Sequence, residues 1–136
     1  MRNITRLLQS AKSSAPKEPY CPDVGDIIWL NFDPQAGREM AGRHSALVVS
    51  PRKYNQFSRL CLLFPITSKV KGYPFESLFP EEFEIPGGTE RGGCVVADQL
   101  KSMSWLERKS DYACRAPDGV LEDAIAKCRT LLPLGD

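Results

Sequence analysis

The sequence predicts a single, mainly β domain with a C-terminal helix, arranged as a small barrel. The length of 136 residues is close to the usual size of one globular domain. From Pro22 onward, short β-rich runs alternate with turn residues, and their spacing is that of a small barrel rather than of β-α-β units. One later segment repeats its apolar residues at helical spacing.

Six apolar runs are expected to form the strands. The first places Ile28, Leu30 and Phe32 on one face, and the turn residues Asp33 and Pro34 end it. A continuous apolar run such as LCLLF is typical of a strand covered on both faces, as in a closed barrel or beneath a packed helix. The six expected strands cover residues 24–32, 46–50, 60–66, 75–79, 94–98 and 100–105.

The C-terminal segment is expected to supply the covering helix. Its apolar residues recur at helical spacing between Val120 and Leu132. Asp118 can cap the first turn, and Pro133 ends the helix.

Composition excludes several classes of protein. Eighteen basic and seventeen acidic residues give a net charge of +1, so a basic groove would have to come from local placement. No apolar run is long enough for a transmembrane helix, so we expect no membrane partner. Five widely spaced cysteines and a single histidine, His44, predict neither a disulfide framework nor a metal site, and no cofactor is expected. The absence of an apolar signal-peptide core favours the reducing cytoplasm.

Residues 1–20 differ from the rest and are interpreted as a flexible extension to a domain formed by residues 21–136. The extension is cationic and contains no acidic residue before Glu18. A solvated tail, a short amphipathic helix that docks on a partner or an anionic surface, and an organelle transit peptide all fit this pattern.

Two polar loops form the candidate site. The first spans residues 33–45, and connections of this length in a small domain are usually functional or disordered. The second follows the third strand, so both loops are expected at one rim of the barrel. Their candidate residues are Arg38, Glu39, Arg43 and His44 in the first loop, and Thr67, Ser68, Lys69 and Lys71 in the second.

Three stretches of the chain carry a specific set of motifs. They are PDVGDIIWLNFDPQAGREMAGRHSALVVSPRKYN, CLLFPITSKVKGYPFE and GCVVADQLKSMSW. Together they closely resemble the MazF/PemK family of toxin endoribonucleases, over about residues 22–105. The resemblance implies an SH3-like β-barrel of the MazF/CcdB type and a homodimer. It also implies sequence-specific, metal-independent cleavage of single-stranded mRNA, which inhibits translation and growth, and a MazE-like antitoxin in a type II toxin-antitoxin system.

The resemblance also assigns individual positions. Glu39 matches the acidic residue of the family's first loop, Thr67 the hydroxyl residue beside the phosphate, and Gln99 a residue that faces RNA. The chain departs from the family at the catalytic arginine. The family usually reads GxRP, whereas this chain reads GRHS, so His44 stands on the arginine position and Arg43 precedes it.

RNA cleavage by the 2′-hydroxyl needs a base, an acid and a group that stabilises the charged phosphorane. His44 suits proton transfer, Arg43 can supply the cation, and Thr67 can donate a hydrogen bond. Glu39 would act as the base or as an anchor for Arg43. Adjacent residues of a regular strand point to opposite faces, so Arg43 and His44 share a site only if the chain is irregular there. Alternatively, Arg43 acts alone, or the enzyme is weakened.

Further residues are candidates for binding the substrate. Phe32 lies at a strand end beside the charged loop and could stack on a base, and the cationic residues could follow the phosphates. The substrate-binding candidates are Phe32, Arg38, Ser68, Lys69, Lys71 and Gln99. Two other functions stay open: a CcdB-like toxin that binds a protein target, and a barrel that only binds RNA or its antitoxin.

Overall fold

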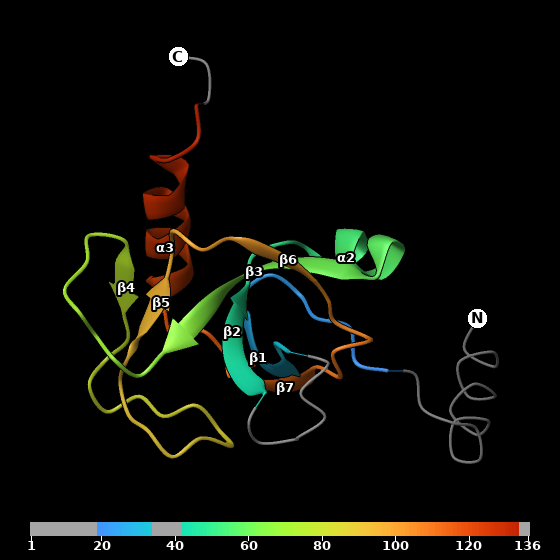
Figure 1. The fold of residues 1–136 in the computed structure, drawn as a ribbon, viewed down its shortest axis with the longest axis horizontal. Helices are drawn as coiled ribbons and strands as arrows, with labels where there is room; N and C mark the ends of the chain where they lie inside the picture. Colours follow the sequence, from blue (N-terminus) through green and yellow to red (C-terminus); the bar gives the residue numbers. More distant parts are fainter. Residues whose placement is uncertain (1–18, 34–41, 134–136) are drawn as a thin grey trace, which may run out of the picture.

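The computed structural model describes residues 19–33 and 42–133 (Figure 1). These residues form a mainly β fold with a C-terminal helix, which confirms the predicted class. The sheet order is β4-β5-β3-β2-β1-β7, and β6 also pairs with β3, all antiparallel. The elements are β1 (Asp26–Asn31), β2 (Arg43–Val48), α2 (Arg52–Ser58), β3 (Leu60–Thr67), β4 (Glu76–Leu78), β5 (Cys94–Val96), β6 (Lys101–Ser104), β7 (Asp111–Arg115) and α3 (Val120–Arg129).

Within the described residues, the sheet does not close into a barrel. Strand β3 pairs with β6 over Leu60–Leu63 and with β5 over Ile66–Thr67, so the sheet divides around β3. Strands β4 and β7 lie at the two ends of the strand order. The short strands β5 and β6 therefore share one long neighbour instead of closing the ring.

All six expected strands are present, and two further elements were not predicted. Strand β7 has the sequence DYACR, whose charged ends and exposed side chains give no apolar run. Helix α2 has seven residues, of which Asn55 alone is buried, so it lacks an amphipathic pattern.

The prediction that Asp118 caps the first turn of α3 is wrong. Gly119, not Asp118, occupies the N-cap position, and no side chain caps the helix. The φ of Gly119 is 86°, a left-handed conformation that favours glycine. The helix ends at Arg129, three residues before Leu132 and ahead of Pro133.

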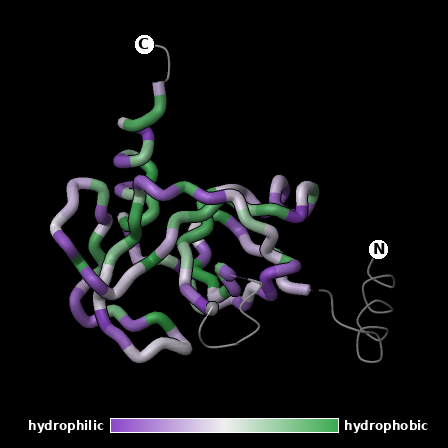
Figure 2. The backbone as a smooth tube through the Cα atoms, in the orientation of Figure 1, coloured by the Kyte–Doolittle hydropathy of each residue, from purple (hydrophilic) through white to green (hydrophobic). Residues whose placement is uncertain are grey.

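The strands β1, β2 and β3 bury different residues on their two faces. One face, here called the α3 face, carries Ile27, Leu47 and Phe64 and packs against the apolar side of α3. Figure 1 shows α3 beside β4 and β5, and Figure 2 shows hydrophobic and hydrophilic segments alternating along it. The opposite face, here called the Trp105 face, contains Ile28, Leu30, Ala46, Val48, Cys61, Leu63 and Trp105.

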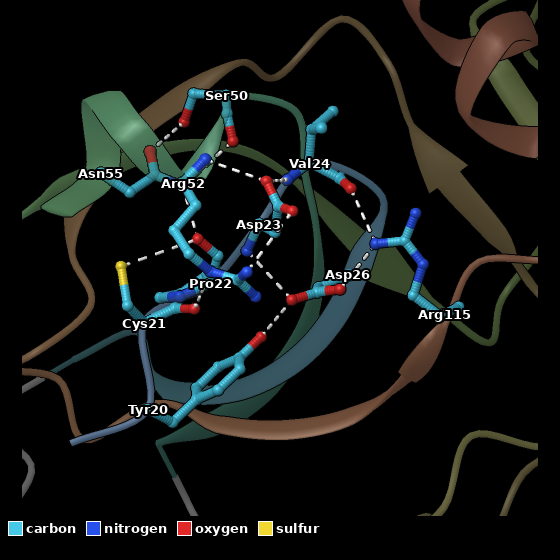
Figure 3. Close-up of polar contacts among 10 residues, drawn as sticks. All are labelled: Tyr20, Cys21, Pro22, Asp23, Val24, Asp26, Ser50, Arg52, Asn55 and Arg115. Carbon is cyan, nitrogen blue, oxygen red and sulfur yellow. Dashed lines mark hydrogen bonds and ion pairs between the residues drawn. The ribbon is translucent and has the colours of Figure 1, made fainter. Parts of the chain in front are cut away.

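A polar network joins the residues before β1 to the sheet (Figure 3). The Tyr20 hydroxyl donates a hydrogen bond of 2.5 Å to the buried Asp26 carboxylate. This carboxylate also accepts a hydrogen bond of 2.8 Å from the Arg115 guanidinium. Burial, and then the bond to Asp26, raises the pKa of Tyr20, so its hydroxyl stays protonated. Pro19 and Tyr20 are the described part of the expected extension, and residues 1–18 lie outside the described residues.

Tyr20→Phe is expected to lower the free energy of unfolding by about 1–2 kcal/mol, because Asp26 loses a charge-assisted hydrogen bond. Chemical denaturation measures this loss. Tyr54→Phe is the matched control, since Tyr54 is 41% exposed on α2. Equal unfolding free energies for the two variants would show that the Tyr20 hydroxyl does not stabilise the fold.

Candidate functional site

Arg43 and His44 begin β2 and point to opposite faces of the sheet. The strand is regular here, with Arg43 paired to Asn31 and His44 paired to Leu30. Leu30 is buried on the Trp105 face, so the His44 side chain emerges on that side and Arg43 on the α3 side. The expectation that a regular strand separates these two side chains is confirmed.

The Arg43 guanidinium is held by three partners. Its Nη2 donates to Asp111 Oδ2 at 2.5 Å and to the carbonyl oxygen of Trp29 at 3.4 Å, and its Nη1 donates to Asn31 Oδ1 at 3.1 Å. The Arg43 side chain is only 21% exposed, whereas that of Asp111 is 77% exposed. The Asp111 carboxylate therefore offsets the charge of a guanidinium that is already fixed in position.

His44 is exposed and contacts an aromatic ring. Its imidazole lies 5.2 Å from the Phe32 ring in an edge-to-face arrangement, measured between ring centroids. The Phe32 amide donates to the Gly42 carbonyl at 2.8 Å, which brings together the two ends of the first loop. The predicted residues Arg38 and Glu39 belong to this loop and lie outside the described residues.

Thr67, the last residue of β3, belongs to the same face as His44. Along β3, Cys61 and Leu63 lie on the Trp105 face, and alternation assigns Thr67 to that face. Strands β2 and β3 pair Ala46 with Pro65. Continuing this register by two residues along each strand brings His44 opposite Thr67.

The Thr67 hydroxyl has a defined orientation. Its oxygen accepts a hydrogen bond of 3.1 Å from the Lys69 amide, so its hydrogen is left to donate elsewhere. Gly93 allows the close approach of β5 here, since a Cβ on Gly93 would lie 2.4 Å from the Thr67 carbonyl oxygen. Ser68 and Lys69 follow β3 and are exposed.

The segment around Lys71 is a turn fixed by Glu76. The two carboxylate oxygens of Glu76 accept the amides of Lys71 and Gly72, each at 2.9 Å. The Lys71 ammonium lies 5.9 Å from the centre of the Tyr73 ring. The Lys71 amide is the main cause that lowers the pKa of Glu76.

Glu76→Gln is expected to destabilise the protein at neutral pH. Because the native pKa of Glu76 is lowered, its stabilisation is complete above the ordinary glutamate value of about 4.3 and is lost as the pH falls through the native value. The melting temperatures of parent and variant should therefore differ at pH 7 and converge in acid. Glu82→Gln is an exposed control. A difference that is constant with pH would contradict the ionic role.

Gln99 lies apart from the other candidates. It is exposed after β5, and its amide donates to the Val96 carbonyl at 3.3 Å. It does not line the cavity described next.

A cavity of about 450 Å³ lies on the α3 side of β1 and β2. The segment of residues 85–90 closes it, because the Trp29 indole nitrogen donates to the Pro86 carbonyl at 2.7 Å. A Cβ on Gly87 would lie 3.0 Å from that nitrogen, so glycine permits this approach. The lining residues are Trp29, Arg43, His44, Ser45, Ile66, Ser68, Ile85, Gly87, Gly88, Thr89, Glu90 and Asp111.

Sequence reasoning missed several of these cavity residues. Asp111 belongs to the unpredicted strand β7, so no local pattern indicated it. Glu90 lines the cavity because the segment of residues 85–90 closes over it, and no local sequence pattern indicates that closure. Trp29 was visible in the GD-x-x-W motif, but its apolar neighbours indicated core packing.

The described residues offer no metal site, and two of the buried thiols are kept protonated. Within them, no group of three or more His, Cys, Asp or Glu side chains could hold a metal ion. All five cysteines are free, and burial raises the pKa of Cys61 to about 12 and that of Cys94 to about 11, so both thiols stay protonated. None of the helices in residues 19–33 and 42–133 is long and apolar enough to cross a membrane.

Residues 23–132 match the family described as PemK-like, MazF-like toxin of type II toxin-antitoxin system. This chain belongs to that family. The endoribonuclease toxin MazF of Escherichia coli K12 is 46% identical over 89 residues, which are 65% of this chain and 74% of that toxin. The family resemblance predicted from the sequence motifs is thereby confirmed.

Solved structures of the family support the fold. MazF from Deinococcus radiodurans is 42% identical, covers 85% of this chain and 99% of its own, and superposes with a TM-score of 0.70. A MazE-MazF structure from the same organism is 40% identical, with 85% and 100% coverage and a TM-score of 0.71. A mycobacterial endoribonuclease is 16% identical, with 88% and 99% coverage and a TM-score of 0.63, and shares the fold.

Proposed function

We propose that this chain is the endoribonuclease toxin of a type II toxin-antitoxin system and cuts single-stranded mRNA at short sequence motifs, without a metal ion. Family membership supports the reaction class. The observation that carries the site assignment is the placement of His44 and Thr67 on one face, where the loop containing Glu39 returns to the sheet.

The reaction transfers two protons around one phosphorus atom. The Glu39 carboxylate accepts the proton of the 2′-hydroxyl while the 2′-oxygen forms its bond to phosphorus. Thr67 donates its hydroxyl hydrogen to a non-bridging oxygen as charge develops there. The bond from phosphorus to the 5′-oxygen breaks, and the His44 imidazolium gives that oxygen a proton. The products carry a 2′,3′-cyclic phosphate and a 5′-hydroxyl.

His44 suits the acid role because its position in the family carries a cation. A protonated imidazole is a cation that can also release a proton near neutral pH, which a guanidinium cannot do. Arg43 acts as a positioning residue in this proposal. Its guanidinium is occupied by Asn31, Trp29 and Asp111, so Asp111 fills the anchor role that Glu39 could otherwise have had.

The remaining candidates bind the substrate. Phe32 is partly buried beside His44 and offers its ring to a base. Ser68, Lys69 and Lys71 are exposed residues of the segment after Thr67, so they can contact the phosphates of the RNA. Arg38 and Gln99 are kept as further candidates for contacts with the RNA.

The proposed assembly is a cytoplasmic homodimer that a MazE-like antitoxin inhibits. Leu78 on the edge strand β4 and Leu131 beyond α3 are exposed apolar side chains that a second copy could cover. Solved MazE-MazF structures of similar chains support an antitoxin of that kind. The acidic segment of such an antitoxin would compete with RNA for the face that carries His44 and Thr67.

Incubation of the purified protein with a mixed-sequence RNA in EDTA tests the proposal. We expect cleavage with 2′,3′-cyclic phosphate and 5′-hydroxyl ends, because the 2′-oxygen is the nucleophile. Products with a 3′-hydroxyl and a 5′-phosphate would mean that water attacks instead. Binding of the RNA without cleavage would indicate a catalytically weakened protein that only binds RNA. The absence of both binding and cleavage would favour a toxin that acts on a protein target.

A further inference from the structure

We propose that the outer face of α2 binds single-stranded RNA at a distance from the cleaved phosphate, as a second contact surface for the substrate. This face and the residue that ends it comprise Lys53, Tyr54, Phe57 and Arg59, and together they are here called the α2 surface. The inference rests on the proposed RNA cleavage and adds a place where a long substrate is held away from the reacting atoms.

The α2 surface lies in a basic part of the chain. Residues 40–75 contain no acidic residue, although acidic and basic residues are nearly balanced over the whole chain. The basic residues of this part are Arg43, Arg52, Lys53, Arg59, Lys69 and Lys71. Among the described residues, neither Lys53 nor Arg59 forms an ion pair, whereas Arg52 is paired with Asp23 at 3.8 Å. Two cations of the α2 surface can therefore contact phosphates.

Two aromatic rings are exposed beside these cations. Phe57 is 88% exposed, and Tyr54 is also exposed. Lys53 and Phe57 are four positions apart on α2, so their side chains are neighbours on one face of the helix. Proteins that bind single strands combine such features, because bases stack on the rings while cations contact the phosphates.

Helix α2 is held in place from its inner side (Figure 3). The side-chain amide of the buried Asn55 donates to the carbonyl oxygens of Pro22 at 2.9 Å and Ser50 at 3.0 Å. The Trp105 indole nitrogen donates to the Asn55 carbonyl oxygen at 2.9 Å. The backbone of α2 is therefore already ordered for binding, which lowers the entropic cost of the contact.

The α2 surface and the proposed reaction site lie at opposite ends of the pair formed by β2 and β3. Helix α2 connects the end of β2 to the start of β3, whereas His44 and Thr67 lie at the start of β2 and the end of β3. The eight residues of β3 extend about 25 Å, at about 3.3 Å per residue. A base on Phe57 is therefore several nucleotides away from the cleaved phosphate, and only a long substrate can reach both.

The composition of the α2 surface favours RNA over a protein partner. A second copy docked symmetrically on it would bring the cations of both copies together, which is unfavourable. An amphipathic peptide needs a continuous apolar groove, whereas each ring in RKYNQFS has polar or charged neighbours. Figure 1 also shows α2 at the opposite end of β3 from β4 and α3, the elements beside which Leu78 and Leu131 are assigned to a second copy.

Binding of mixed-sequence oligodeoxynucleotides tests the α2 surface, because they lack the 2′-hydroxyl and stay uncut. Oligomers of about 4 and about 16 nucleotides span the site sizes of single-strand-binding OB folds. We expect Phe57→Ala to weaken binding of the longer oligomer about tenfold and to leave that of the shorter one unchanged. Lys53→Gln should lower the slope of log K against log salt by about 0.7 for the longer oligomer. Arg129→Gln, at the exposed end of α3, is the control and should bind like the parent.

Cleavage of a long RNA gives a second measurement. Phe57→Ala should raise KM and leave kcat unchanged, because α2 does not touch the reacting phosphate. Equal affinity of the parent and Phe57→Ala for the longer oligomer would overturn the proposal. So would poly-L-glutamate that binds the parent as tightly as the longer oligomer does, which would indicate an acidic peptide. A changed oligomeric state of Phe57→Ala would assign the surface to a second copy and would also overturn it. If Phe57→Ala weakens oligomer binding and the parent cuts no RNA, the proposed function fails and the α2 surface stands.

Discussion

His44→Ala is expected to lower kcat/KM for RNA cleavage by about 10²–10⁴-fold, the usual contribution of a positioned proton donor. The imidazole lies on the face assigned to Thr67, at the loop end where Gly42 meets Phe32. The alanine variant loses the proton for the 5′-oxygen and the positive charge beside the phosphate. Single-turnover cleavage of a defined RNA measures the effect.

Arg43→Lys is the informative companion variant. Lysine keeps the charge but cannot reach Asn31, Trp29 and Asp111 together, so the variant tests positioning rather than proton transfer. We expect a smaller loss of kcat than for His44→Ala, with a pH dependence like that of the parent. A mild effect of His44→Ala beside a severe effect of Arg43→Lys would assign the catalytic cation to Arg43.

Thr67→Val is expected to lower kcat by about 10²–10³-fold, the usual loss when one donor to a charged transition state is removed. Valine keeps the β-branched shape that suits the end of β3, so the strand should be preserved. The Lys69 amide holds the hydroxyl oxygen at 3.1 Å, and this contact directs the hydrogen away from the turn.

Thr67→Ser restores a hydroxyl and should recover most of the activity lost in Thr67→Val. Thermal unfolding of both variants separates catalysis from stability. Full activity of a folded Thr67→Val would remove Thr67 from the mechanism.

The sequence predicted those helices and strands whose buried residues form a regular apolar pattern along the chain. Strand β1 and the long strand β3 were visible as apolar runs, and α3 was visible through Ala124 and Cys128 at helical spacing. Strand β7 could not be seen, because only its pairing with β1 makes DYACR a strand. The cap of α3 was assigned to the better capping side chain, whereas the backbone needs a left-handed residue at Gly119.

The candidate site was predicted as a set of residues but not as an arrangement. Alternation along a strand correctly separated Arg43 from His44. The partners of Arg43 depend on a tertiary pairing, since Asp111 is 68 positions away in sequence. The cavity likewise requires Trp29 to meet the Pro86 carbonyl, 57 positions away. Contacts at such separations follow from the fold and leave no local trace in the sequence.

The pH dependence of cleavage in EDTA, measured for the parent and for His44→Arg, tests most directly the claim that His44 transfers a proton. Arginine keeps a cation at the family's position but cannot release a proton. We predict that kcat/KM of the parent falls as the pH rises, because only the protonated imidazole of His44 can give a proton to the 5′-oxygen. In His44→Arg the rate should be lower in acid and show no such fall. Identical pH profiles for the two proteins would contradict the account.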